Sequence, residues 1–158
     1  MSDLTIAVLS AVFTIFGALI IFLFKDAIEN LFIFPKRRFK KKLIEVKANL
    51  LFYKNLLTNA FNRAEINDIF FEKIFRCQEK LRKNWVGISI TYPAIIRIPI
   101  ISKEPSKEQI KKIQGNLLFL SNSALVYFEK NQPHDISSAC TARQEKIDEI
   151  LSIIDRCV

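Results

Sequence analysis

An uninterrupted run of uncharged and mostly apolar residues at positions 4–24 constrains this chain more than any other feature of its sequence. As an α-helix, the run would extend about 30 Å, which is the thickness of the hydrocarbon core of a bilayer. A cleaved signal peptide would show a basic segment before a shorter apolar stretch, and small residues at a cleavage site. The run fits that pattern badly, so the sequence predicts one transmembrane helix.

The charges on either side of the run indicate its orientation. On the N-terminal side, Asp3 offsets the amino group, whereas the C-terminal side carries Lys25 and then a dense basic cluster at 36–42. Positively charged flanks stay in the cytoplasm. We therefore expect a single-pass protein with its N-terminus outside the cell and its C-terminal domain in the cytoplasm.

Small and hydroxyl-bearing residues recur at spacings of three and four along the run, so they share one helix face. In a bilayer, such residues let two helix backbones approach closely, and hydroxyls can hydrogen-bond across the contact. A single-pass chain has no second membrane helix of its own. We therefore interpret this face as a homo-oligomer contact, formed by Ala7, Ser10, Ala11, Thr14, Gly17 and Ala18.

The segment after the run mixes charge with large apolar side chains. Residues 25–34 are expected to extend the helix through the membrane interface, so that the N-terminal unit is 1–34. Pro35 predicts a kink or a break, because proline lacks an amide donor. Residues 35–42 then form a basic juxtamembrane linker.

Six of the eight net positive charges lie in this linker. A basic run at this position attracts anionic lipid headgroups. Nucleic acid is the disfavoured alternative, because only Phe39 interrupts the run and the rest of the chain is nearly neutral. The predicted lipid-binding residues are Lys36, Arg37, Arg38, Lys40, Lys41 and Lys42.

The remaining residues, 43–158, favour an all-α domain, because glycine is rare and apolar residues recur at helical spacing. We expect an antiparallel four-helix cytoplasmic bundle. The expected core positions are Phe39, Leu43, Val46, Leu50, Tyr53, Leu57 and Ala60; Ile66, Phe70, Ile74, Cys77 and Leu81; Ile110, Ile113, Leu117, Leu120, Ala124 and Phe128; and Ile136, Cys140, Ile147, Ile150 and Ile154.

Local signals suggest where these helices begin. Asn62 with Glu65, and Ser106 with Gln109, have capping-box spacing, and Asp135 or Ser137 can cap the last helix. Residues 92–105 contain three prolines between isoleucines, which excludes a regular helix there. Such an apolar connector must be covered, by default by its own domain.

No motif for catalysis, a metal or a cofactor stands out. The single histidine, His134, lies in an expected loop, and catalysis would need a positioned partner for it. The three cysteines have no metal-site spacing and are interpreted as small buried residues in a reducing compartment: Cys77, Cys140 and Cys157. A polar Ser121-Asn122-Ser123 segment inside an apolar helix is interpreted as a hydrogen-bonded helix–helix contact.

The same segment carries a resemblance. With Leu120 it reads L-S-N-S, and the chain resembles small bacterial membrane proteins with one N-terminal membrane helix, a basic linker and a helical domain that carries this element late. The resemblance covers the layout of most of the chain. It implies location in the bacterial inner membrane, and it implies no activity.

These features favour a non-enzymatic, membrane-anchored interaction or scaffold protein. It would self-associate through its membrane helix and present the helical domain to a cytoplasmic protein partner. The alternative is an oligomeric pore or effector, for example in antiphage defence, in which Ser10 and Thr14 line a narrow opening; ion flux in liposomes separates the two. A hydrolase or nuclease is disfavoured, because the sequence lacks the features of a catalytic site.

The orientation leads to a first prediction. A tag added after Val158 should resist protease in intact spheroplasts and be digested once the membrane is permeabilised, because the basic flank holds the C-terminal side inside. Immunoblotting of the tag makes the measurement, with a known periplasmic protein as the positive control. Digestion in intact spheroplasts would contradict the orientation.

Overall fold

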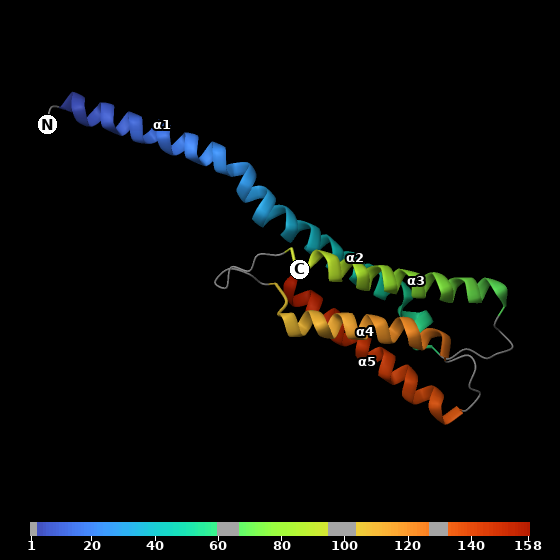
Figure 1. The fold of residues 1–158 in the computed structure, drawn as a ribbon. Helices are drawn as coiled ribbons and strands as arrows, with labels where there is room; N and C mark the ends of the chain where they lie inside the picture. Colours follow the sequence, from blue (N-terminus) through green and yellow to red (C-terminus); the bar gives the residue numbers. More distant parts are fainter. Residues whose placement is uncertain (1–2, 60–66, 95–103, 127–132) are drawn as a thin grey trace.

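A computed structural model describes residues 3–59, 67–94, 104–126 and 133–158 (Figure 1). Every regular element in these ranges is helical. In chain order they are α1 (Asp3–Ile28), η1 (Glu29–Ile33), α2 (Phe34–Thr58), α3 (Asp68–Thr91), α4 (Lys107–Val126) and α5 (Pro133–Cys157).

The first three elements follow one another without a break. The short element η1 is a π-helix that ends immediately before the turn containing Pro35. Proline has no N–H for the carbonyl four residues earlier, and its ring crowds that carbonyl, so a wider turn relieves the clash. The chain therefore bends between α1 and α2 and stays helical (Figure 1). Of the two outcomes predicted at Pro35, a kink or a break, the structure shows the kink.

Helix α1 projects away from the rest of the molecule (Figure 1). Within the described residues, one helix is long and apolar enough to cross a membrane, and α1 forms its first part. In the apolar stretch of this helix, 0% of the residues are buried inside the molecule. Phenylalanine and isoleucine side chains on α1 are correspondingly exposed, including Phe13, Ile21 and Phe22. Burial of this surface therefore has to come from outside the chain.

Helices α2 to α5 pack together as a helical bundle. Helix α2 contacts α3 and α5, and α4 likewise contacts α3 and α5, so the four helices surround one core. In Figure 1, the chain runs along α3 in the opposite direction to α2, and along α5 in the opposite direction to α4. Each helix contributes to the core on the apolar face that its spacing predicts.

The predicted core positions are largely confirmed. The fully or almost fully buried ones are Phe39, Leu43, Val46, Leu50, Leu57, Ile74, Cys77, Leu81, Ile110, Ile113, Leu117, Leu120, Ala124, Ile147, Ile150 and Ile154. Tyr53, Phe70 and Cys140 are only half-buried. Ile88, which could extend the stripe of 66–81 toward Tyr92, is in the core, and Ile153 belongs to the core although the patterns above do not include it. Ala60, Ile66 and Phe128 lie outside the described residues.

The start of α4 agrees with the capping signal predicted from the sequence, whereas the starts of α3 and α5 differ from the predicted ones. Ser106 and Gln109 form the predicted capping box: the Ser106 amide donates to Gln109 Oε1 at 2.7 Å, and the Gln109 amide donates to Ser106 Oγ at 3.2 Å. Helix α3 is capped instead by Asn67, whose side chain accepts from the Phe70 amide at 2.9 Å. The predicted pair Asn62 and Glu65 lies outside the described residues.

Helix α5 begins earlier than predicted. It starts at Pro133, so His134 lies in its first turn and not in a loop. Proline suits the first turn of a helix, because its missing N–H would have no partner inside the helix there. The capping positions predicted at Asp135 and Ser137 are therefore helical residues.

Buried polar contacts join the helices, and they include the Ser121-Asn122-Ser123 segment. Gln78 of α3 donates to the Ser121 carbonyl at 2.9 Å, and Arg82 donates to Ser121 Oγ at 3.1 Å. Arg143 of α5 donates to the carbonyls of Leu57 and Ser123 at 2.9 and 3.2 Å. The predicted helix–helix role is confirmed for Ser121. Ser123 contributes only its main-chain carbonyl, because its Oγ donates to the Leu120 carbonyl within α4 at 3.4 Å, and Asn122 is exposed.

Two leucines on α4 provide a matched test of the core. Leu120 is 0% exposed and Leu118 is 42% exposed, although both lie on the same helix. Leu120→Ala should lower the free energy of unfolding by about 2–5 kcal/mol, because it leaves a cavity. Leu118→Ala should change it by about 0.5 kcal/mol or less. Denaturant unfolding followed by circular dichroism measures both, and equal costs would contradict the packing.

Candidate lipid interface at the helix junction

The start of α2, the end of α3, the start of α4 and the end of α5 meet at the end of the bundle from which α1 departs (Figure 1). Contacts between the helices fix this end. The rings of Phe39 in α2 and Tyr92 after α3 lie 5.7 Å apart, and Lys47 in α2 pairs with Asp155 in α5 at 2.6 Å. The basic run predicted from the sequence lies at this junction.

The structure places the basic run inside α2, so residues 35–42, which the sequence marks as a basic juxtamembrane linker, are helical. Phe39, in the middle of the run, is 2% exposed and belongs to the core. Successive residues in an α-helix are rotated by about 100°. The six basic side chains are therefore distributed around α2, and they fall into three groups with different surroundings.

The first group is paired with carboxylates of the same domain. Lys36 lies 2.9 Å from Glu104, just before α4, and Lys42 lies 2.8 Å from Glu45. Lys42 also packs across Gly87 of α3, where a Cβ atom would collide with its side chain. These two ammonium groups are half-buried and bind within the bundle.

The second group comprises Arg37, Lys40 and Lys41, which are exposed. Within the described parts of the chain, none of the three has a hydrogen bond or ion pair. Arg37 and Lys41 are four residues apart and lie on the face of α2 opposite Phe39. Their charge is available to an external anion at the junction.

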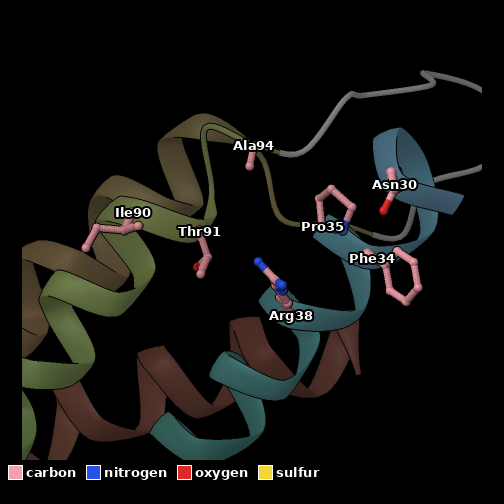
Figure 2. Close-up of a pocket in the computed structure, with 7 residues that line it drawn as sticks. All are labelled: Asn30, Phe34, Pro35, Arg38, Ile90, Thr91 and Ala94. Carbon is pink, nitrogen blue, oxygen red and sulfur yellow. The ribbon is translucent and has the colours of Figure 1, made fainter. Parts of the chain in front are cut away.

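The third group is Arg38 alone, which is also exposed and differs from the second group in bordering a cavity. Its side chain extends from α2 toward the end of α3, into a cavity of about 410 Å³ (Figure 2). The lining residues come from η1, the start of α2 and the end of α3: Asn30, Phe34, Pro35, Arg38, Ile90, Thr91 and Ala94. No feature of the sequence links Arg38 to Thr91, because their proximity depends on how α2 packs against α3.

The predicted self-association face on α1 is uncovered by the chain itself. Ala7, Ser10, Ala11, Thr14 and Ala18 are exposed, and Gly17 has open space where a Cβ atom would stand. Thr14 Oγ1 donates to the Ser10 carbonyl at 2.8 Å, inside the helix. This bond satisfies the Thr14 donor, so close backbone approach is the contact that the face offers most directly.

A further apolar surface follows one flank of α3. Phe71, Phe75, Val86 and Ile90 are all exposed there. Beside them lies a second cavity of about 360 Å³, lined by Phe75, Gln78, Glu79, Arg82, Lys83, Val86 and Gly87. We call these four exposed residues the α3 strip. The sequence pattern missed it, because it recognises only the face of a helix with the strongest periodicity.

The other reactive side chains of the chain include carboxylates and three thiols. No group of three or more His, Cys, Asp or Glu side chains that could hold a metal ion occurs within the described residues. Burial raises the pKa of Cys77 to about 12, so this thiol is neutral and unreactive near pH 7. Cys140 and Cys157 are half-buried free thiols.

No protein-family model, no curated protein and no solved structure matches this chain. The interpretation of the junction therefore rests on its own residues.

Proposed function

We propose that this protein is a single-pass, non-enzymatic membrane scaffold. Helix α1 spans the bacterial inner membrane with the N-terminus outside, and α2 to α5 form an antiparallel four-helix bundle in the cytoplasm. The protein self-associates through α1, binds anionic headgroups with α2, and presents the bundle to a cytoplasmic protein partner.

The observation that carries this proposal is the complete exposure of α1. The most apolar stretch of this helix has a mean hydropathy of 2.8, and 0% of that stretch is buried inside the molecule. A monomeric soluble protein rarely leaves such a large apolar surface uncovered. A bilayer covers it without further contacts, and an α-helix satisfies its own backbone hydrogen bonds there.

The basic groups at the junction support lipid contact. Arg37, Arg38, Lys40 and Lys41 carry charge that the described part of the domain does not neutralise, whereas Lys36 and Lys42 already have carboxylate partners. We therefore propose that these four residues, out of the predicted six, contribute most of the attraction to anionic lipid. A basic residue near the membrane surface contributes about 1 kcal/mol.

The α3 strip supports the scaffold role. It places large apolar side chains on the outside of a bundle whose core is already filled by other residues. The charged groups that border its cavity already have partners in the chain: Lys83 pairs with Glu79 at 2.6 Å, and Arg82 donates to Ser121 Oγ. A partner that offers an apolar segment would fit this strip.

The contribution of the exposed basic residues can be measured with the one tryptophan of the chain. Trp85 lies in α3 and can transfer energy to a dansyl-labelled lipid headgroup in nanodiscs that hold the full-length protein. Transfer should rise as anionic lipid replaces zwitterionic lipid, because the charged junction is drawn to the surface. The double variant Arg37→Gln with Lys41→Gln should lose most of this rise.

The matched control is Lys73→Gln with Lys80→Gln. It removes the same charge from exposed positions on α3, which lie several helical turns before the end of α3 at the junction. These sites are separated from the junction by more than the Debye length of about 8 Å at physiological salt. The control should behave as the wild type; an equal loss in both double variants would contradict a local lipid contact.

Self-association is tested with one substitution on the small-residue face. Gly17→Leu should convert the oligomer to a monomer, because its side chain keeps the two backbones apart. Open space surrounds this position within the monomer, so the substitution should not disturb the fold of the chain itself. Light scattering of the protein in mild detergent measures the mass of the assembly.

Val12→Leu is the control for this experiment. Val12 is exposed on α1 outside the small-residue face, so its enlargement should leave the oligomer intact. A wild-type protein that is monomeric under these conditions, or equal effects of the two substitutions, would reject self-association through this face.

A further inference from the structure

Helix α2 carries a second set of regularly spaced side chains on the side that faces away from the core. Ile44 is 46% exposed and Leu51 is 51% exposed, and Ala48 and Asn55 are exposed as well. These four positions are separated by steps of four, three and four residues, so they share one face of the helix. We call them the outer α2 stripe. Phe52, which is 79% exposed, lies beside the stripe.

The described part of the chain leaves the outer α2 stripe uncovered. Helix α2 packs against α3, where Asn49 donates to Asn84 at 3.3 Å, and against α5, where Lys47 pairs with Asp155 at 2.6 Å. Asn49 and Lys47 lie on opposite flanks of the core face of α2, and the stripe lies on the remaining side. Its cover therefore has to come from another molecule.

The spacing of the stripe identifies the kind of surface that fits it. Alternating steps of four and three form the seam between two helices that wrap around each other. In heptad notation, Ala48 and Asn55 take position a, and Ile44 and Leu51 take position d. The small Ala48 lets two helices approach closely, and a single asparagine at position a specifies the register of a helix pair.

The membrane helix favours a second copy of this chain as the occupant. Because α1, η1 and α2 follow one another without a break, two copies that associate through α1 send their α2 helices out of the membrane on the same side and in the same direction. Equivalent residues then lie at equal distances from the bilayer. The shared anchor also raises the effective concentration of one stripe near the other, so a short seam is sufficient.

Charges beside the stripe agree with a parallel pair. In such a pair, the residue at position g of one helix faces the residue at position e, five residues later, on the other helix. Here these positions hold Lys40 and Glu45. Lys40 has no ion pair among the described residues, and Lys42 contacts Glu45 through Oε2 only. Two symmetric attractions between opposite charges are therefore available to the pair.

Like charges limit the seam at its membrane end. Arg37 and Lys41 continue the same spacing toward the membrane, so each would lie near the same charge on the other copy. A lysine at one seam position costs stability and restricts the oligomeric state. We therefore place the close contact at Ile44–Asn55 and leave the basic end of α2 open to anions.

We propose that the outer α2 stripe is the docking surface for a second copy of this chain, bound in parallel, so that two bundles pair below their membrane helices. Ile44 and Leu51 pack against the same residues of the other copy, and Lys40 faces Glu45 of the partner subunit. This inference rests on the proposed self-association through α1, and it adds a contact that orients the two bundles.

The test places one accessible thiol in the stripe of the full-length protein in liposomes. Cys140→Ser and Cys157→Ser remove the half-buried thiols, which leaves only the buried Cys77. A disulfide requires two Cα atoms within about 7 Å. On oxidation, Ala48→Cys should therefore give a dimer on a non-reducing gel that persists when the protein is diluted with lipid. Asn122→Cys, exposed on α4, is the control and should stay monomeric.

Two leucines of similar exposure separate the stripe from general surface hydrophobicity. Added to Ala48→Cys, Leu51→Glu should weaken the association at least about tenfold, because it would bury a carboxylate at the seam. Leu118→Glu, at a position on α4 that is 42% exposed, should leave the dimer unchanged. Circular dichroism should show the same thermal unfolding for both variants. Equal losses, or no loss in either variant, would overturn the docking surface.

Exchanging two charges tests the parallel alignment. Glu45→Lys places a like charge opposite Lys40 and should reduce the cross-linked fraction. Adding Lys40→Glu restores opposite charges between the copies and should recover the dimer, although the contact of Lys42 with position 45 stays broken in both variants. If the double variant does not recover, the parallel pairing is wrong.

The failure of this inference is distinguishable from failure of the proposed function. A protein that light scattering shows to be oligomeric, but whose Ala48→Cys variant does not cross-link, would overturn the α2 contact and leave self-association through α1 in place. A cross-linked dimer that survives Gly17→Leu would support the α2 contact and reject the dependence of self-association on α1.

Discussion

Continuous helical hydrogen bonding connects the apolar first helix of this protein to its bundle. An apolar segment that leaves water has to remain helical, because no solvent is present to pair with its N–H and C=O groups. Here the helical hydrogen bonding does not stop where charged residues begin. It passes through the π-helical turn before Pro35 and continues into α2, whose Phe39 and Leu43 are core residues. The apolar helix and the core of the bundle are consequently parts of one covalent, hydrogen-bonded rod.

This continuity determines which end of the bundle lies beside α1. Once α2 is both a continuation of α1 and a core helix, the end of α3 and the start of α4 must lie beside the first turns of α2. The ring contact between Phe39 and Tyr92 and the ion pair between Lys36 and Glu104 are both formed at this end of the bundle. The basic side chains then have three different surroundings: two ammonium groups are held by carboxylates, three exposed charges face solvent, and one exposed guanidinium borders a cavity.

Much of the fold was predictable from residue spacing. The apolar positions of all four bundle helices were identified because a stable helix in a small domain has to bury one continuous face, as Leu50, Ile74, Leu117 and Ile150 do. The capping box at Ser106 was predictable for a similar reason, since both partners lie within one turn. The Asn67 cap and the start of α5 at Pro133 were missed, because competing capping residues nearby have comparable local preferences.

The sequence alone determined that residues 4–24 are uncharged and mostly apolar, that their flanks differ in charge, and that four later segments favour helices with defined inner faces. These are local properties, set by residues within a few turns of one another. Tertiary structure decided which basic side chains are neutralised, because Glu104 is far from Lys36 in sequence. It also decided that Arg38 and Thr91 border one cavity and that the α3 strip stays outside the core. Such outcomes depend on how helices pack side by side, and no spacing along a single helix encodes that geometry.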